Sequence, residues 1–176
     1  MSYFPISCAL FMLISSASAH LEGAVEPQIP AQEKARITRV AQLALHNHDI
    51  TLAHYQSTIK YLNARPCLGV DRTLTSAMKT KLSPAIAKRE GEKQLDILQA
   101  FRFKAWHILY IATGTADDHF MFYDGDPVAS KNKGVWGGGA SIFETADIQK
   151  WTLANIAGIP PELASCFAWH VSLNRS

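Results

Sequence analysis

Residues 101–143 constrain the fold of this chain more than any other stretch. They contain the densest runs of β-branched and aromatic side chains in the sequence, interrupted only by short polar segments rich in Gly, Asp and Pro. Side chains of the first kind favour strands, and residues of the second kind favour turns. The pattern predicts a three-stranded antiparallel meander, with strands at about 101–111, 119–123 and 135–143.

The first of these strands changes character along its length. Arg102 and Lys104 alternate with apolar residues near its start, whereas from Trp106 onward both alternating sets are mainly apolar. A strand that is charged on one face only at its margin runs into a region covered on both sides. We expect helices to provide that cover.

Three consecutive glycines, Gly137 to Gly139, interrupt the third predicted strand. Glycine weakens a strand, so these residues indicate a bulge or a place where another backbone or a ligand comes close. A phosphate-binding loop is the more specific functional alternative. It is disfavoured because no Lys-Ser or Lys-Thr pair follows the glycines.

Helical periodicity precedes and follows the meander. Apolar residues at three- and four-residue steps predict a helical hairpin from 31–47 and 51–62, followed by helices at about 73–82 and 83–99. Another helix is predicted at 145–156. Residues 165–173 alternate large apolar residues with small or polar ones, which favours a closing strand, although some of the same positions also fit helical spacing.

These elements predict a single α+β domain over residues 31–176. Its N-terminal helices pack on one face of an antiparallel meander sheet, and a late helix and a closing strand complete it. With 176 residues, 48% of them hydrophobic, the chain has the size of one domain. The order of elements resembles that of cystatin-like and nuclear-transport-factor-like cone folds, in which a curved sheet wraps a helix. That resemblance covers element order alone and implies no activity.

The N-terminal residues 1–19 have the character of a secretory signal. They carry no charged side chain, contain an apolar run at 8–14 and end in Ala17-Ser18-Ala19. The run is too short to span a bilayer, and signal peptidase accepts this small-residue pattern, although the usual positive charge near the N-terminus is absent. The sequence predicts a cleaved signal peptide, an extended leader arm at 20–30 and a periplasmic or extracellular protein without a transmembrane segment.

Two cysteines, Cys67 and Cys166, remain after the predicted signal. A lone pair of cysteines in an oxidising compartment usually joins. We therefore expect a disulfide between them, linking the helical half of the chain to its last segment.

Two polar loops, 113–118 and 124–134, are predicted to form a binding surface presented by the rigid meander. Their mixed charges can steer a charged partner, and an adjacent tryptophan can serve as an aromatic anchor. The candidate binding residues are Asp117, Asp118, Asp124, Asp126, Lys131, Lys133 and Trp136.

The sequence contains no nucleotide loop, metal-ligand set or catalytic constellation with a diagnostic spacing, so no catalytic residue, metal or cofactor is predicted. A net charge of +2 with scattered Lys and Arg argues against nucleic acid. We expect an exported, non-catalytic binding or inhibitory protein of the immunity type, with a protein partner outside the cytoplasm. One alternative is a structural component of a surface assembly. The other is a small secreted hydrolase or ligand-binding cone that uses His107, His119, Asp118, Tyr123 and Asp124.

Mass spectrometry of the exported protein should find His20 at the N-terminus. The expected cleavage follows Ala19, because the small-residue run there is the site that directly follows the apolar core. A mature protein that retains Met1 would contradict the predicted localisation.

Overall fold

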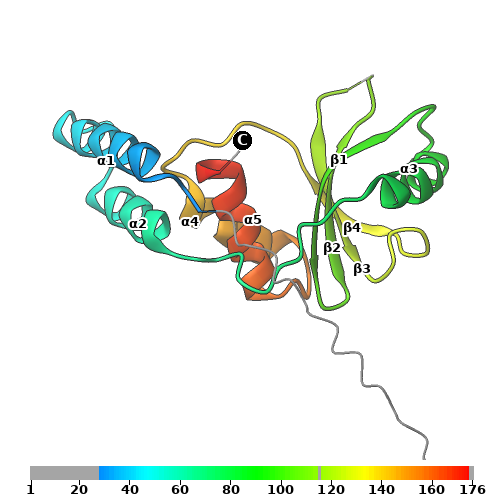
Figure 1. The fold of residues 1–176 in the computed structure, drawn as a ribbon. Helices are drawn as coiled ribbons and strands as arrows, with labels where there is room; N and C mark the ends of the chain where they lie inside the picture. The colour runs from blue at the N-terminus through cyan, green and yellow to red at the C-terminus, as the bar shows by residue number, and fades with distance from the viewer. Residues whose placement is uncertain (1–27, 115, 175–176) are drawn as a thin grey trace, which may run out of the picture.

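A four-stranded antiparallel sheet lies between helices (Figure 1). The computed structural model describes residues 28–114 and 116–174, so the predicted signal peptide and most of the leader arm lie outside the described residues. Strands β1 (Asp96–Phe103), β2 (Trp106–Ala112), β3 (His119–Asp124) and β4 (Asn132–Trp136) pair in chain order. The predicted α+β class and antiparallel meander are confirmed, with one strand more than expected.

The additional strand arises from a turn inside the stretch that was predicted as one strand. Lys104 and Ala105 form a two-residue turn, and Phe103 pairs with Trp106 across it. Lys104 has a φ of 55°, a conformation that usually selects Gly or Asn in so short a hairpin. The turn therefore carries no residue that would reveal it in the sequence.

Helix α3 (Ser76–Glu90) replaces the two helices predicted at 73–82 and 83–99. It begins at Thr75, whose side chain accepts a hydrogen bond from the Met78 amide, and it continues through Pro84. Gly91 ends it in the left-handed conformation, with a φ of 77°. The prediction that helix extends to residue 99 is wrong, because β1 begins at Asp96.

The closing strand predicted at 165–173 is also wrong, because these residues form helix α5 (Pro161–Leu173). Pro161 suits the first helical position, where its missing N–H costs nothing. From Cys166 to Leu173 every residue is buried, so the helix has no polar face to impose a period of 3.6 residues. Within residues 28–114 and 116–174, none of the helices combines the length and the apolar character that a membrane crossing requires.

The sheet separates two hydrophobic clusters. On one face, strand residues that include Phe101, Ile108 and Phe122 belong to the cluster that contains α5. On the other face, residues that include Leu109 and Tyr123 belong to the cluster that contains α3. The expected cover on both sides of the sheet is confirmed.

Helices α1 (Ala31–His46) and α2 (Leu52–Asn63) form the predicted helical hairpin, and α4 (Thr145–Asn155) matches the predicted late helix. Figure 1 shows α4 and α5 between this hairpin and the sheet, so α3 is the N-terminal helix that covers a sheet face. The indole N–H of Trp169 in α5 donates to the Tyr61 carbonyl in α2 at 3.2 Å. The hairpin thus packs on the C-terminal helices.

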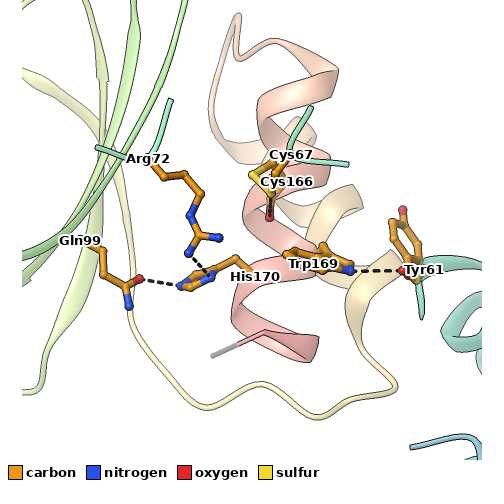
Figure 2. Close-up of a disulfide and its surroundings, with 7 residues drawn as sticks. All are labelled: Tyr61, Cys67, Arg72, Gln99, Cys166, Trp169 and His170. Atoms are coloured by element: carbon orange, nitrogen blue, oxygen red, sulfur yellow. Dashed lines mark hydrogen bonds between the residues drawn. A yellow bond between two sulfur atoms is a disulfide. The ribbon is translucent and has the colours of Figure 1, made fainter. Parts of the chain in front are cut away.

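The predicted disulfide between Cys67 and Cys166 is present. Both cysteines are buried, with exposed fractions of 3% and 0%. The bridge ties the segment after α2 to the middle of α5 (Figure 2). It fixes the middle of α5 to the segment that follows α2.

Reducing this disulfide, or replacing both cysteines with serine, should lower the free energy of unfolding. The bridge joins residues 99 positions apart, and in the chain-entropy model a loop of that size contributes about 4 to 5 kcal/mol. Urea unfolding with and without reductant measures the difference. An unchanged unfolding midpoint after complete reduction would contradict the prediction.

Candidate functional site

An open groove of about 800 Å³ lies at the end of the sheet where the β2–β3 loop meets the chain that leaves β4. Acidic, glycine and ring-bearing residues line it together. Its lining consists of Tyr110, Ala116, Asp117, Asp118, His119, Val135, Gly137, Gly138 and Gly139. The structure thereby joins the predicted acidic loop to the glycine segment that the sequence marked as a point of close approach.

Strand register explains why these two segments meet. Phe120 pairs with Trp136, so the residue after Trp136 passes beside His119. A Cβ added to Gly137 would lie 3.4 Å from the His119 Cβ, and Gly138 has a φ of 146°. The approach at Gly137 is close but near ordinary van der Waals contact, whereas the backbone conformation at Gly138 favours glycine. The glycines therefore follow the strand and form one side of the groove.

The floor of the groove is rigid. The Tyr110 ring stacks on Phe120, with centroids 4.4 Å apart and planes 21° apart. Phe120 is buried and meets the Phe167 ring of α5 edge-on at 5.1 Å. The half-buried Tyr110 side chain is held in place by the core beneath it.

The groove is acidic. Asp117 and Asp118 are exposed, and the described residues that line the groove include no lysine or arginine. His119 Nδ1 lies 3.0 Å from the Asp117 carbonyl oxygen. Because a carbonyl only accepts, Nδ1–H donates and the remaining ring nitrogen, Nε2, is an acceptor when the ring is neutral.

The second predicted loop lies at the other end of β3, away from the groove (Figure 1). The side chain of Arg89 in α3 holds it, donating to the carbonyl of Pro127 at 2.9 Å and to that of Ser130. The two nominated loops are therefore not brought together. Six residues of β3, at about 3.3 Å each, separate them.

Within this second region, the candidate side chains have different surroundings. Asp124, Lys131 and Lys133 are exposed. Asp126 is partly engaged in the turn, because its carboxylate accepts from the Val128 amide at 2.9 Å. Lys133 lies in β4, which begins within the stretch predicted as a loop.

Trp136, the predicted aromatic anchor, lies half-buried against the core. Its ring is 5.9 Å from that of Phe120 and 5.5 Å from that of Phe167. Its packing connects β4 to α5. The exposed apolar side chain at the groove is instead Val135, which is 46% exposed.

The residues considered for a hydrolase are distributed over separate regions. Asp118 and His119 line the groove, whereas His107 lies on the sheet face that is covered by α3. Tyr123 is fully buried, and burial raises the pKa of its hydroxyl, reinforced by the charge of Glu90. Among residues 28–114 and 116–174, no three or more His, Cys, Asp or Glu side chains are grouped to hold a metal ion.

A partly buried chain of polar side chains, which was not predicted from the sequence, crosses from the segment after Cys67 to the sheet (Figure 2). The Arg72 guanidinium donates to His170 Nδ1 at 3.1 Å, and His170 Nε2 lies 2.6 Å from Gln99 Oε1. Since Arg72 only donates, Nε2 carries the proton and donates to Gln99. The one signal in the sequence is a histidine inside the apolar segment that forms α5.

Comparison with known protein families, with curated proteins and with solved structures finds no match for this chain.

His107 should make the stability of the protein depend on pH. Burial lowers the pKa of its ring, with Arg102 adding to the effect and the carbonyls of Ala105 and Gly125 and the charge of Asp126 partly opposing it. The folded protein therefore resists protonation of this ring. The stability that the neutral ring contributes is complete above its usual pKa, near 6.5, and is lost as the pH falls below that value.

Urea unfolding between pH 7.5 and pH 5 tests this dependence. The free energy of unfolding of the wild type should fall over that range, and His107→Gln should show a smaller fall. His46→Gln, at an exposed position in α1, is the matched control and should follow the wild type. Equal slopes for all three proteins would refute the assignment.

Proposed function

We propose that this protein is an exported binding protein that holds a positively charged, extended segment of a partner protein in the acidic groove. The observation that carries the proposal is the meeting of Asp117, Asp118 and three successive glycines around one open groove. Binding there is non-catalytic and acts on a macromolecule outside the cytoplasm, either to inhibit it or to keep it in place.

The glycine segment favours an extended peptide as the bound element. Gly137 and Gly139 are exposed and have no side chains, so a second backbone can approach them closely. The segment continues from β4, which is the last strand of the sheet. An extended peptide that runs beside it could use main-chain hydrogen bonds for affinity, as in recognition by strand addition.

The side chains of the groove supply the specificity. The carboxylates of Asp117 and Asp118 favour Lys or Arg in the partner, and charge complementarity raises the rate of association. Tyr110 and Val135 offer apolar surface for the stems of such side chains. A polar rim around a small apolar floor is the arrangement expected of a peptide-binding site.

The local chemistry supports binding over hydrolysis. Among the described residues that line the groove, the acid or base candidates are His119, Tyr110 and the two aspartates, and none of the lining residues is a serine, threonine, cysteine or lysine. Asp117 and Asp118 are exposed members of a loop. Such side chains suit attraction of a charged partner.

A photo-crosslinking side chain at Val135 tests whether the groove contacts a partner in the producing cells. The control carries the same crosslinker at Leu153 in α4, which has a similar exposure, 43% against 46%. A protein that crosslinks from position 135, not from 153, and that is lost when Asp117 and Asp118 are both changed to lysine supports the proposal. Identical crosslinking from both positions would count against it.

Charge reversal at Asp118 should weaken the binding of a basic peptide without loss of stability. A fluorescein-labelled decalysine peptide is the probe, and fluorescence anisotropy at about 0.1 M ionic strength, where the screening length is about 10 Å, gives its affinity. Asp118→Lys should reduce affinity about tenfold, equivalent to roughly 1.4 kcal/mol, with an unchanged melting temperature because the side chain is exposed.

Asp49→Lys is the matched control. It makes the same charge change at an exposed position between α1 and α2, so it should leave decalysine binding within about twofold, since distant surface charges are screened by salt. Equal losses for both variants would show that only net charge matters, and would refute a groove-specific site.

A further inference from the structure

A second cavity lies on the other side of the sheet from α5, between α3, strands β1 and β2 and the start of the β3–β4 loop. We call it the α3 cavity. Its volume is about 160 Å³, close to the roughly 150 Å³ of an engineered protein cavity that binds benzene. A molecule of about six non-hydrogen atoms therefore fits.

Most of its lining is apolar. Leu82 from α3, Leu109 from β2 and Pro127 from the loop are buried, and Met78 and Ala100 complete this part of the wall. Small-molecule sites have this composition, with apolar walls and a few polar groups that orient the ligand. The walls would hold a short aliphatic chain.

Arg102 supplies an unsatisfied donor at this cavity. Its Nη2 donates to the Asp71 carboxylate at 2.5 Å, but its Nε is buried and has no hydrogen-bond partner among the described residues. Burying a charged donor without an acceptor is costly. The Arg102 side chain as a whole is 31% exposed and lines the cavity, so a bound anion there would lie close to its positive charge.

The other charged and titratable groups that line the α3 cavity differ in their exposure and in their hydrogen-bond partners. Lys81 on α3 is exposed and lines the cavity as a second cation. Arg102 pairs directly with His107 in the strand register, and the carboxylate of Asp126 is partly engaged by the Val128 amide. The donors Arg102 and Lys81 thus favour a carboxylate, while Asp126 works against it.

We propose that the α3 cavity binds a short-chain aliphatic monocarboxylate, with its carboxylate on Arg102 and Lys81 and its chain against Leu82 and Leu109. The site is separate from the acidic groove. The proposal for the α3 cavity does not depend on which partner the groove binds.

Sodium butyrate is the probe, and the NMR signals of the His107 ring provide the readout. Butyrate should shift these signals saturably, with a dissociation constant of about 1 mM or lower. It should also raise the pKa of His107, because a nearby anion favours the protonated ring. Butanol, which has a four-carbon chain without a charge, and n-butylamine, which has the opposite charge, are the comparison compounds. No saturable shift with butyrate, or an equal response to either comparison compound, would overturn the proposal.

Variants of the polar groups provide a second test. Lys81→Gln should weaken butyrate binding about tenfold, whereas Lys79→Gln, at an exposed position of the same helix outside the cavity, should leave it unchanged. Asp126→Asn should tighten binding, because it removes a like charge and keeps the oxygen that accepts from Val128. Weaker binding by Asp126→Asn, or equal effects of the two lysine variants, would contradict the assignment.

Failure of this site is distinguishable from failure of the groove. Asp118→Lys should leave butyrate binding unchanged, and Lys81→Gln should not reduce the binding of decalysine. Loss of both ligands in either variant, with an unchanged melting temperature, would show that the two sites are coupled and would overturn the claim of two separate sites.

Discussion

The burial of the second half of α5 on all sides is the constraint on which the rest of the structure depends. Phe167 meets the rings of Phe120 and Phe122 on the sheet at 5.1 Å each. The indole N–H of Trp169 donates to the Tyr61 carbonyl in α2, and Cys166 forms a disulfide with Cys67 in the segment after α2. The sheet, the helical hairpin and the connecting segment therefore share one helix as their common surface. The floor of the acidic groove is rigid because Phe120 belongs to this packing.

The same burial explains which parts of the fold can be predicted from the sequence. Helices α1, α2 and α4 have one face toward the protein and one toward solvent, so their residues keep a helical period. In α5 the second half has no solvent face, and its alternation of large and small residues imitates a strand. The β1–β2 turn was not predicted for a local reason. Lys104 takes a positive φ there, although it is neither glycine nor asparagine.

The candidate site was predictable in part. Asp117 and Asp118 were recognisable as exposed loop residues, and the glycines were recognisable as a point of close approach. Their meeting in one groove depends on the register of β3 and β4, which no short motif encodes. The α3 cavity lies beyond sequence reasoning altogether, since Lys81, Arg102 and Asp126 come from three separate elements. The composition of a loop predicts that its side chains are exposed, whereas tertiary packing decides which of these side chains lie close together.

The position of α5 in the chain has a consequence for the order of folding. The more aromatic face of the sheet, which includes Phe101, Phe120 and Phe122, stays uncovered until residues 161–173 have been synthesised. Contacts across such long sequence separations form late and slowly. During synthesis the meander therefore exposes an aromatic surface that a chaperone can recognise. The core is complete only when α5 has been synthesised and has packed against this face of the sheet.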